Sequence, residues 1–382
     1  MEFAIWAYPW DLLDEGVNAV ANRLTELGIQ EINLATNYHT VQAFLPHNPQ
    51  RRTFFANASA FFQPSDTYAG LQPVTNKTMG DRCWLTEIID ALPDDITLTS
   101  WTIGCHNTRL GTQYPSYTIT TPFGDDLRYG LCPSHPAVHQ FLVDLVADLD
   151  ARDVFDRIEL ESFDYFHGRG FGWHHDKFHT RLGSLGEFLF GLCFCDHCQG
   201  HASDRGIDVQ AANDACRSAI IACAEGELDA DIDPRAWLDG HPAVAAYVQA
   251  RTKTLGVVFD DLRKATSSQL GYYPLLPPAQ AWMHGADLSR LSSALDYHKV
   301  IAYESTPADA ARAVQTADAL TPDMPLHAGI LPGHPHLHDL ESTSGVVDAV
   351  IDAGASRLSF YNYGLLPERN LEWIGQATEP YR

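Results

Sequence analysis

Two glutamates occupy alternate positions in the short segment Ile158-Glu159-Leu160-Glu161. Side chains alternate between the two faces of a β-strand, so Ile158 and Leu160 would share one face and the glutamates the other. A buried carboxylate is costly unless it is paired, so an inward glutamate suggests binding or catalysis. Glu161 lies nearer the C-terminal end of the predicted strand than Glu159. The alternative is that buried arginines or hydroxyl groups hold both glutamates in a structural role.

A second carboxylate is needed if the chemistry is cleavage of a glycosidic bond. One group protonates the leaving oxygen while the other acts as nucleophile or activates water. Glu304 follows the apolar run Val300-Ile301-Ala302-Tyr303 and is the best-placed partner for Glu161. We therefore predict a glycoside hydrolase with Glu161 as nucleophile or base and Glu304 as general acid or acid/base. Asp164 is a weaker candidate, and Glu304 could instead be a surface residue that opens a loop.

Aromatic and amide side chains gather near the ends of the predicted strands. Sugars offer apolar C–H faces and many hydroxyl groups, so a site for them mixes aromatic rings with polar groups. Any one of these residues could instead be packed in the core. The residues that we predict to bind substrate are Tyr8, Trp10, Asn37, His39, Trp101, His106, Glu159, His175, Trp282, Tyr303, His334 and Asn362.

Three cysteines, Cys193, Cys195 and Cys198, fall within six residues of one another. Thiolates at such spacing are typical ligands of tetrahedral Zn²⁺. Cys132, in a Cys-Pro-Ser-His-Pro segment, is the candidate fourth ligand. Four thiolates leave the metal no open position, so this zinc would be a structural staple. Free thiols are the alternative.

The same region resembles the β-galactosidases of glycoside hydrolase family 42. The resemblance covers about residues 130–205: the segment Cys132-Pro133-Ser134-His135-Pro136-Ala137-Val138, then a helix, a strand with an acidic end and a Cys-x-Cys-x-x-Cys cluster. It implies that Cys132, Cys193, Cys195 and Cys198 bind structural zinc and that Glu161 is the acid/base.

Two positions depart from that family. The family has Asn before its acid/base glutamate where this chain has Leu160, and its nucleophile is a glutamate at the end of strand 7, where this chain reads Ala328-Gly329-Ile330-Leu331. Acids on strands 4 and 6 are instead similar to the arrangement in α-galactosidase-like barrels, where the strand 4 carboxylate is the nucleophile. A distant group of barrel glycosidases that shares the zinc staple fits both observations.

Histidines supply the main rival hypothesis. With Glu161 or Asp176 they could bind a catalytic divalent metal, as in metal-dependent barrel sugar isomerases and epimerases. Loop histidines at irregular spacing more often contact substrate or solvent. The histidines in question are His167, His174, His175, His179, His334, His336 and His338.

The elements that must position these residues alternate between short apolar runs and longer amphipathic stretches, the pattern of βα units around a parallel sheet. We predict a single-domain (β/α)8 barrel over residues 1–382. In such barrels the active site forms where the strands end. The predicted strands are Phe3 to Tyr8, Glu31 to Ala35, Thr97 to Ile103, Arg157 to Ser162, Leu270 to Tyr273, Lys299 to Tyr303, Leu326 to Ile330 and Arg357 to Tyr361.

Long insertions are expected after three of these strands, at residues 36–79, 104–134 and 163–241, and the third carries the cysteine cluster. All three leave C-terminal strand ends, so they would roof one pocket. A roofed pocket favours a small glycoside or an oligosaccharide end as substrate.

Charge and composition exclude several other partners. Twenty-five Lys and Arg against 49 Asp and Glu give a net charge of −24, which argues against nucleic acid and anionic membranes. The scarcity of lysine among the basic residues resembles proteins of salt-loving organisms. No basic leader and no run of roughly 18 apolar residues is present, so we expect a cytoplasmic location. Assembly into a homo-oligomer stays open.

Overall fold

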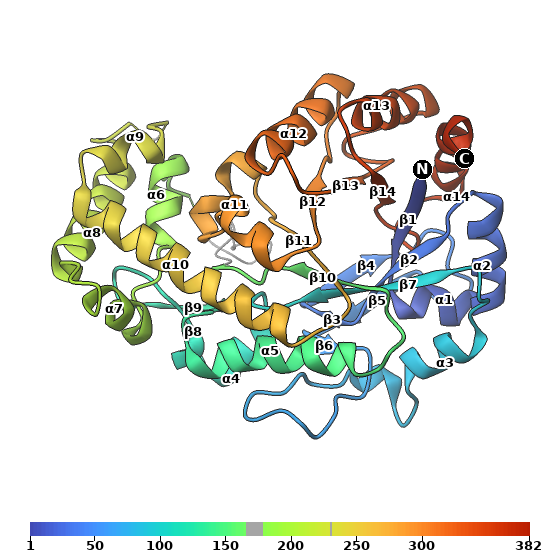
Figure 1. Ribbon diagram of the computed structural model, residues 1–382, viewed down its shortest axis with the longest axis horizontal. Helices are drawn as coiled ribbons and strands as arrows, with labels where there is room; N and C mark the ends of the chain where they lie inside the picture. The colour runs from blue at the N-terminus through green and yellow to red at the C-terminus, as the bar shows by residue number, and fades with distance from the viewer. Residues whose placement is uncertain (166–178, 230) are drawn as a thin grey trace.

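The computed structural model describes residues 1–165, 179–229 and 231–382 (Figure 1). Eight parallel strands close into a barrel in which chain neighbours lie side by side and the last strand pairs with the first. This confirms the predicted (β/α)8 fold. The strands are β1 (Glu2–Ala7), β2 (Glu31–Ala35), β7 (Thr97–Ile103), β10 (Arg157–Glu161), β11 (Gln269–Tyr273), β12 (Tyr297–Ile301), β13 (Leu326–Ile330) and β14 (Arg357–Phe360).

The observed strand β12 begins and ends earlier than the sequence predicts. Tyr297 pairs with Gly271, and His298 pairs with Tyr272, so the strand begins two residues before Lys299. The strand ends at Ile301, and Glu304 therefore lies in the connection that follows it rather than at the strand end.

Helices on the outside of the barrel bury the outward face of each strand. Ile158 and Leu160 of β10 are fully buried among them, as alternation predicts. The helices are α1 (Pro9–Glu15), α2 (Val17–Glu26), α3 (Trp84–Ala91), α5 (Pro136–Asp150), α10 (Pro242–Lys264), α11 (Leu288–Leu291), α12 (Pro307–Leu320), α13 (Leu340–Asp352) and α14 (Glu368–Thr378), with short 3-10 turns η3 (Pro278–His284), η4 (Ser292–Ala294) and η5 (Glu379–Tyr381).

The barrel interior contains buried charges that are paired. Near the N-terminal ends of the strands, Glu31 forms ion pairs with Arg157, at 2.7 Å, and with Arg357. Nearer the C-terminal ends of the strands, the ring of Tyr297 packs against Gly271, where an added Cβ would lie 2.2 Å from that ring. Ion pairs and close packing thus fill the interior at these two levels.

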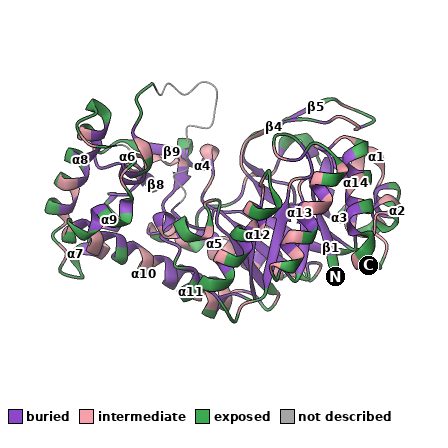
Figure 2. Cartoon of the chain, turned by 90° about the horizontal axis from the view of Figure 1, so that it is seen from above, coloured by how far each residue is buried: buried purple, intermediate pink, exposed green. Residues whose placement is uncertain are grey.

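Three insertions leave the C-terminal ends of β2, β7 and β10. The third forms a helical lobe beside the barrel, and α10 runs from that lobe back to the barrel (Figure 1). The antiparallel strands β4 and β5 form a hairpin at the edge of the molecule (Figure 2). The elements of the insertions are β3 (Asn37–Tyr38), β4 (Val41–Phe44), β5 (Thr53–Ala56), β6 (Ser59–Ala60) and η1 (Lys77–Met79); α4 (Thr108–Gln113), η2 (Pro115–Tyr117), β8 (Thr118–Thr120) and β9 (Asp126–Leu131); and α6 (Gly183–Phe190), α7 (Asp196–Ser203), α8 (Val209–Glu225) and α9 (Pro234–Asp239).

Within the described ranges, none of the helices combines the length and apolarity that a membrane span would require.

Candidate active site

Glu161 ends β10 and faces into the mouth of the barrel. Its Oε2 atom accepts hydrogen bonds from Trp101 Nε1 at 2.6 Å and from the Tyr273 hydroxyl at 2.8 Å. Trp101 lies on β7 and Tyr273 ends β11, and these are the two strands that pair with β10 on either side. The side chain is 6% exposed, and among the described residues Oε1 has no hydrogen bond, so this oxygen is left to meet a ligand.

The electrostatics of Glu161 favour its protonated form. Burial raises the pKa of the carboxyl, whereas the hydrogen bonds from Trp101 and Tyr273 lower it and the nearby charge of Glu159 raises it again. The raising effects dominate, so the pKa lies above its ordinary value. A carboxyl group with a raised pKa can hold a proton at a pH where ordinary glutamates have lost it.

Aromatic side chains surround Glu161. The Trp101 ring lies 4.7 Å from that of Tyr38 and 5.9 Å from that of Tyr361. Tyr8 donates to the Tyr38 hydroxyl at 3.0 Å, and its own hydroxyl lies 3.3 Å from that of Tyr361. This cluster comes from the ends of several strands, so closing the barrel is what assembles it. Tyr8, Tyr38 and Trp101 are each at most 3% exposed and pack against one another, whereas Tyr361 is half-buried, so its ring and hydroxyl are the part of the cluster open to a sugar ring.

Glu159 lies two residues before Glu161 on β10, deeper in the barrel, and has its own hydrogen-bond and ion-pair partners. Lys299 forms a buried ion pair with its Oε1 atom, and the Tyr297 hydroxyl donates to the same atom at 3.1 Å. Lys299 also donates to Ser359 at 2.9 Å and lies 4.4 Å from the ring centre of Trp6. Glu159 is 1% exposed, so the contacts seen here are those of a residue that supports the floor of the mouth.

Glu304 is half-buried in the connection after β12. It lines a pocket of about 480 Å³ with residues of the β11–η3 connection and of α12, among them Asp309 and Arg312. Ile301 and Tyr303 line the same pocket and also reach the aromatic cluster, where the Tyr303 ring lies 5.7 Å from that of Tyr361. Burial raises the pKa of Tyr303 most. The nearby Tyr361 raises it next, and the charge of Glu161 raises it to a smaller extent. Tyr303 therefore links the pocket that Glu304 lines to the aromatic cluster around Glu161.

Other predicted substrate-binding residues also lie near the mouth. Asn37 is buried and donates to the Ile103 carbonyl at 2.6 Å, and Asn362 accepts from the Gly364 amide at 3.1 Å. The rings of His39 and His106 stack at 4.5 Å, with His39 against Tyr38. Desolvation lowers the pKa of His39 to about 4, so this ring is neutral near pH 7.

Four predicted binding residues are placed differently or fall outside the described ranges. Trp10 is 1% exposed, stacked between Tyr8 at 4.4 Å and Phe54 at 4.0 Å, so it lies behind the cluster. Trp282 lies in η3 and packs against the lobe, 5.1 Å from Phe188. His334 is exposed. His175 lies outside the described residues.

Two residues that touch Glu161 or its surroundings are not among those predicted from the sequence. Tyr273 was within a predicted strand, and alternation from Gly271 would have placed it facing inward and next to Glu161. Asp11 is buried beneath Tyr8, whose amide donates to its Oδ2 atom at 2.8 Å. Burial raises the pKa of Asp11 to about 8, and no pattern in the sequence signals this.

The four predicted metal-binding cysteines do come together. All are buried, and their sulfur atoms lie within 4.8 Å of one another. The Sγ atom of Cys132 is 3.5 Å from that of Cys198 and 3.7 Å from those of Cys193 and Cys195. Thiolates around a tetrahedral ion with metal–sulfur bonds of about 2.3 Å are about 3.8 Å apart, so this group has the spacing to hold a metal ion.

The cluster joins three parts of the chain. Cys132 follows β9, the other three cysteines follow α6, and α10 contributes Tyr247, whose hydroxyl donates to the Cys193 carbonyl at 2.7 Å. The Phe194 amide donates to the Thr120 carbonyl at 2.7 Å. A metal ion here would therefore tie the lobe to the insertion that follows β7.

The histidines of the rival hypothesis form no comparable group in the part of the chain that the structure describes. There, the four cysteines are the one set of three or more residues arranged to hold a metal ion. His334 and His338 are exposed, with ring centres 6.4 Å apart. His167, His174, His175 and Asp176 lie outside the described residues.

Comparison with known proteins gives no match in sequence and several in structure. No family model matches the chain, and no curated protein sequence matches it. The structure is similar to three β-galactosidases: that of the psychrophilic Marinomonas ef1 (TM-score 0.58, 12% identity, 100% of this chain and 59% of that one), that of the Antarctic haloarchaeon Halorubrum lacusprofundi (0.60, 13%, 99% and 58%) and that of Bacillus circulans sp. alkalophilus (0.58, 14%, 99% and 55%).

This chain therefore spans somewhat more than half the length of each of these β-galactosidases. At such low identity, the likeness is one of fold. The expected resemblance to barrel glycoside hydrolases is thus confirmed at the level of the fold: the chain is a closed (β/α)8 barrel of the kind that these enzymes contain.

Proposed function

We propose that the protein is a glycoside hydrolase that acts on a small glycoside or an oligosaccharide end. The observation that carries this proposal is Glu161, a buried carboxyl group with a raised pKa, one oriented oxygen and one free oxygen, at the mouth of an aromatic-lined barrel. The fold shared with β-galactosidases supports it.

In this mechanism Glu161 is the proton donor to the leaving oxygen. A general acid must be protonated when it acts, and the raised pKa of Glu161 serves that need better than the role of nucleophile. The resemblance to family 42 implies the same role. Trp101 and Tyr273 fix Oε2, which leaves Oε1 to deliver the proton.

Glu304 then takes the complementary role of nucleophile or general base. Its position supports this role through Tyr303, which reaches the cluster around Glu161 while Glu304 lines the adjoining pocket. The half-buried rings of Tyr303 and Tyr361 would contact the sugar, and the buried Tyr8 and Trp101 would hold them from behind.

We further propose Zn²⁺ as the ion held by Cys132, Cys193, Cys195 and Cys198. Four thiolates are a typical zinc set, and a closed set leaves no position for substrate. When bound, the ion supplies a cross-link and no reaction step. It would fix the lobe near β10, since the Ser134 hydroxyl, two residues after Cys132, lies 2.5 Å from that of Tyr165.

The proposal is tested with a panel of α- and β-linked nitrophenyl glycosides. On whichever substrate the wild-type protein cleaves, Glu161→Gln and Glu304→Gln should each lower kcat by about 10²- to 10⁴-fold, the usual loss when acid or base is removed. The control is Glu341→Gln on α13, which is exposed and removes the same charge.

Short exposure to EDTA should leave the rate unchanged, because the proposed zinc takes no part in the reaction. Wild-type activity in Glu161→Gln would refute the proposal. Loss in EDTA that Mn²⁺ or Co²⁺ restores would favour the sugar isomerase instead. Unchanged activity in Glu304→Gln alone would remove Glu304 from the mechanism.

A further inference from the structure

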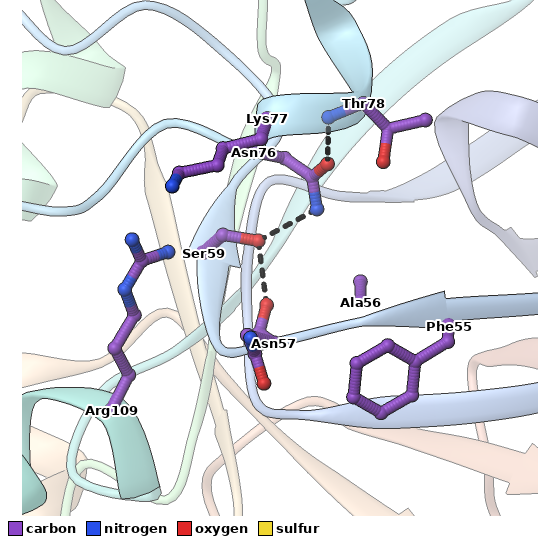
Figure 3. A pocket seen from close by; sticks show the side chains of 8 residues that line it. All are labelled: Phe55, Ala56, Asn57, Ser59, Asn76, Lys77, Thr78 and Arg109. Carbon is purple, nitrogen blue, oxygen red and sulfur yellow. Dashed lines mark hydrogen bonds between the residues drawn. The ribbon is translucent and has the colours of Figure 1, made fainter.

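A second hollow opens among the connections at the C-terminal side of the barrel. It has a volume of about 240 Å³ and lies between the insertion after β2 and helix α4, which follows β7 (Figure 3). A hollow of this size suits one sugar ring or one substituent, since pockets for larger ligands are roughly 300–1,000 Å³. Its lining residues are Phe55, Ala56, Asn57, Ser59, Asn76, Lys77, Thr78 and Arg109.

Two cationic side chains approach this hollow from different elements. Figure 3 shows Lys77 of η1 and Arg109 of α4 extending toward the same space. Among the described residues, neither forms an ion pair with a carboxylate. In a chain of net charge −24, two cations left unpaired at one hollow create a local site of positive potential. Such a site favours an anionic group.

The remaining lining is polar on its floor and apolar at its edge. Asn76 donates to the Ser59 hydroxyl at 2.9 Å, Ser59 donates to the Asn57 carbonyl at 2.7 Å, and the Thr78 amide donates to Asn76 at 2.8 Å (Figure 3). These bonds fix the floor before any ligand arrives. Phe55 is 57% exposed at the edge and provides a flat face for a ring.

The hollow is connected to the candidate active site through one strand pair. Ser59 of β6 pairs with Tyr38 of β3. The Tyr38 ring packs at 4.7 Å against Trp101, which donates to Glu161. The hollow and Glu161 thus lie on the same face of the barrel, and the pair β3–β6 and the side chain of Trp101 connect them.

We propose that this hollow is a subsite for a sugar that carries an anionic substituent, with Lys77 and Arg109 binding the charge and Phe55 and Thr78 contacting the ring. That the ligand is a sugar rests on the function proposed above. The anion is the carboxylate of a uronic acid or a sulfate ester, and Arg109 can bind either through two parallel hydrogen bonds.

The test measures binding of monosaccharides, which contain no glycosidic bond for the enzyme to cleave. Calorimetry at one fixed ionic strength compares glucuronate and glucose 6-sulfate with glucose, and galacturonate and galactose 6-sulfate with galactose. We expect at least one anionic sugar to bind tenfold or more tightly than its neutral parent. The better of the carboxylate and the sulfate identifies the natural group.

The variant Lys77→Gln/Arg109→Gln should lose this preference and bind the anionic sugar about as weakly as its neutral parent, because the charged hydrogen bonds are gone. The charge-matched control Arg205→Gln/Lys253→Gln removes two exposed cations that lie outside the hollow and should keep the preference. The exchange Lys77→Arg/Arg109→Lys conserves the charge and should retain most of the preference for the anionic sugar. Thermal unfolding confirms that each variant is folded.

The outcomes separate this inference from the proposed function. No preference for any anionic sugar, or a preference that Lys77→Gln/Arg109→Gln leaves intact, overturns the subsite even if the protein hydrolyses neutral glycosides. A preference that depends on these two cations supports the subsite even if no glycoside is hydrolysed, in which case the hydrolase proposal alone fails.

Discussion

The hydrogen bond from Tyr273 to Glu161 allows a direct test of how the site sets its acidity. Replacing Tyr273 with phenylalanine removes the hydroxyl that donates to Oε2 at 2.8 Å and leaves the Trp101 bond at 2.6 Å in place. The Tyr273 bond stabilises the charged carboxylate and so lowers the pKa of Glu161. In Tyr273→Phe the pKa of Glu161 should therefore rise further.

The size of this rise follows from the strength of one charged hydrogen bond. Such a bond contributes about 1.5–3 kcal/mol, and 1.36 kcal/mol corresponds to one pH unit, so the change is about one to two units. If Glu161 is the proton donor, the alkaline limb of the kcat/KM profile should move upward by the same amount, because the acid keeps its proton to higher pH. A nucleophile would instead move the acidic limb.

The assay is a titration of ¹³C-labelled glutamate carboxyl groups by NMR, in which Glu161→Gln identifies the Glu161 signal. Tyr272→Phe is a matched control, because Tyr272 is the preceding residue of β11 and donates instead to Asp164, at 2.6 Å. It should leave the Glu161 titration in place. An unchanged or lowered pKa of Glu161 in a folded Tyr273→Phe protein would show that the Tyr273 bond does not stabilise the carboxylate.

Three further predictions concern stability. Gly271→Ala should destabilise the protein by about 1–3 kcal/mol, because the new Cβ would lie 2.2 Å from the Tyr297 ring, whereas Gly200→Ala, with nothing within 4 Å, should be neutral or stabilising in thermal unfolding. Burial raises the pKa of Asp11 to about 8, so folded Asp11 keeps a proton that the unfolded chain loses, and wild-type stability should fall as pH rises from about 4 to about 8. Denaturant unfolding of Asp11→Asn should show a shallower slope than the wild type, because the buried carboxyls of Glu161 and Asp164 also have raised pKa values and still contribute; equal slopes would contradict the assignment. Elemental analysis should find about one zinc ion per chain in the wild type. Cys195→Ser should lose this zinc and unfold at a lower Tm, and a metal-free wild type would exclude the structural zinc site.

The direction of side chains within a strand could be predicted from sequence, but their partners could not. Alternation in β10 was enough to place Leu160 outside and Glu161 inside the barrel. Lys299, which holds Glu159, comes from a strand far along the chain, and only closure of the barrel brings them together. Trp10 near a strand end was predicted to bind substrate, yet Phe54 covers it.

The insertions were harder to predict than the barrel. Their lengths follow from the spacing of the strands, but their internal packing depends on contacts between distant segments. Trp282 follows β11, yet η3 carries it to the lobe, where Phe188 and Arg235 pack against it. The cysteine set is the exception, because metal-ligand chemistry restricts which residues can meet, and Cys132 joins Cys198 as predicted.

The most direct test of the account is a crystal structure of the protein soaked with a mixture of monosaccharides, combined with an anomalous scan at the zinc edge. The account predicts a sugar ring at the barrel mouth with an oxygen about 2.6–3.2 Å from Glu161 Oε1, and zinc bound at Cys132 and its three partners. A sugar bound away from Glu161, or a metal held by histidines inside the mouth, would contradict it.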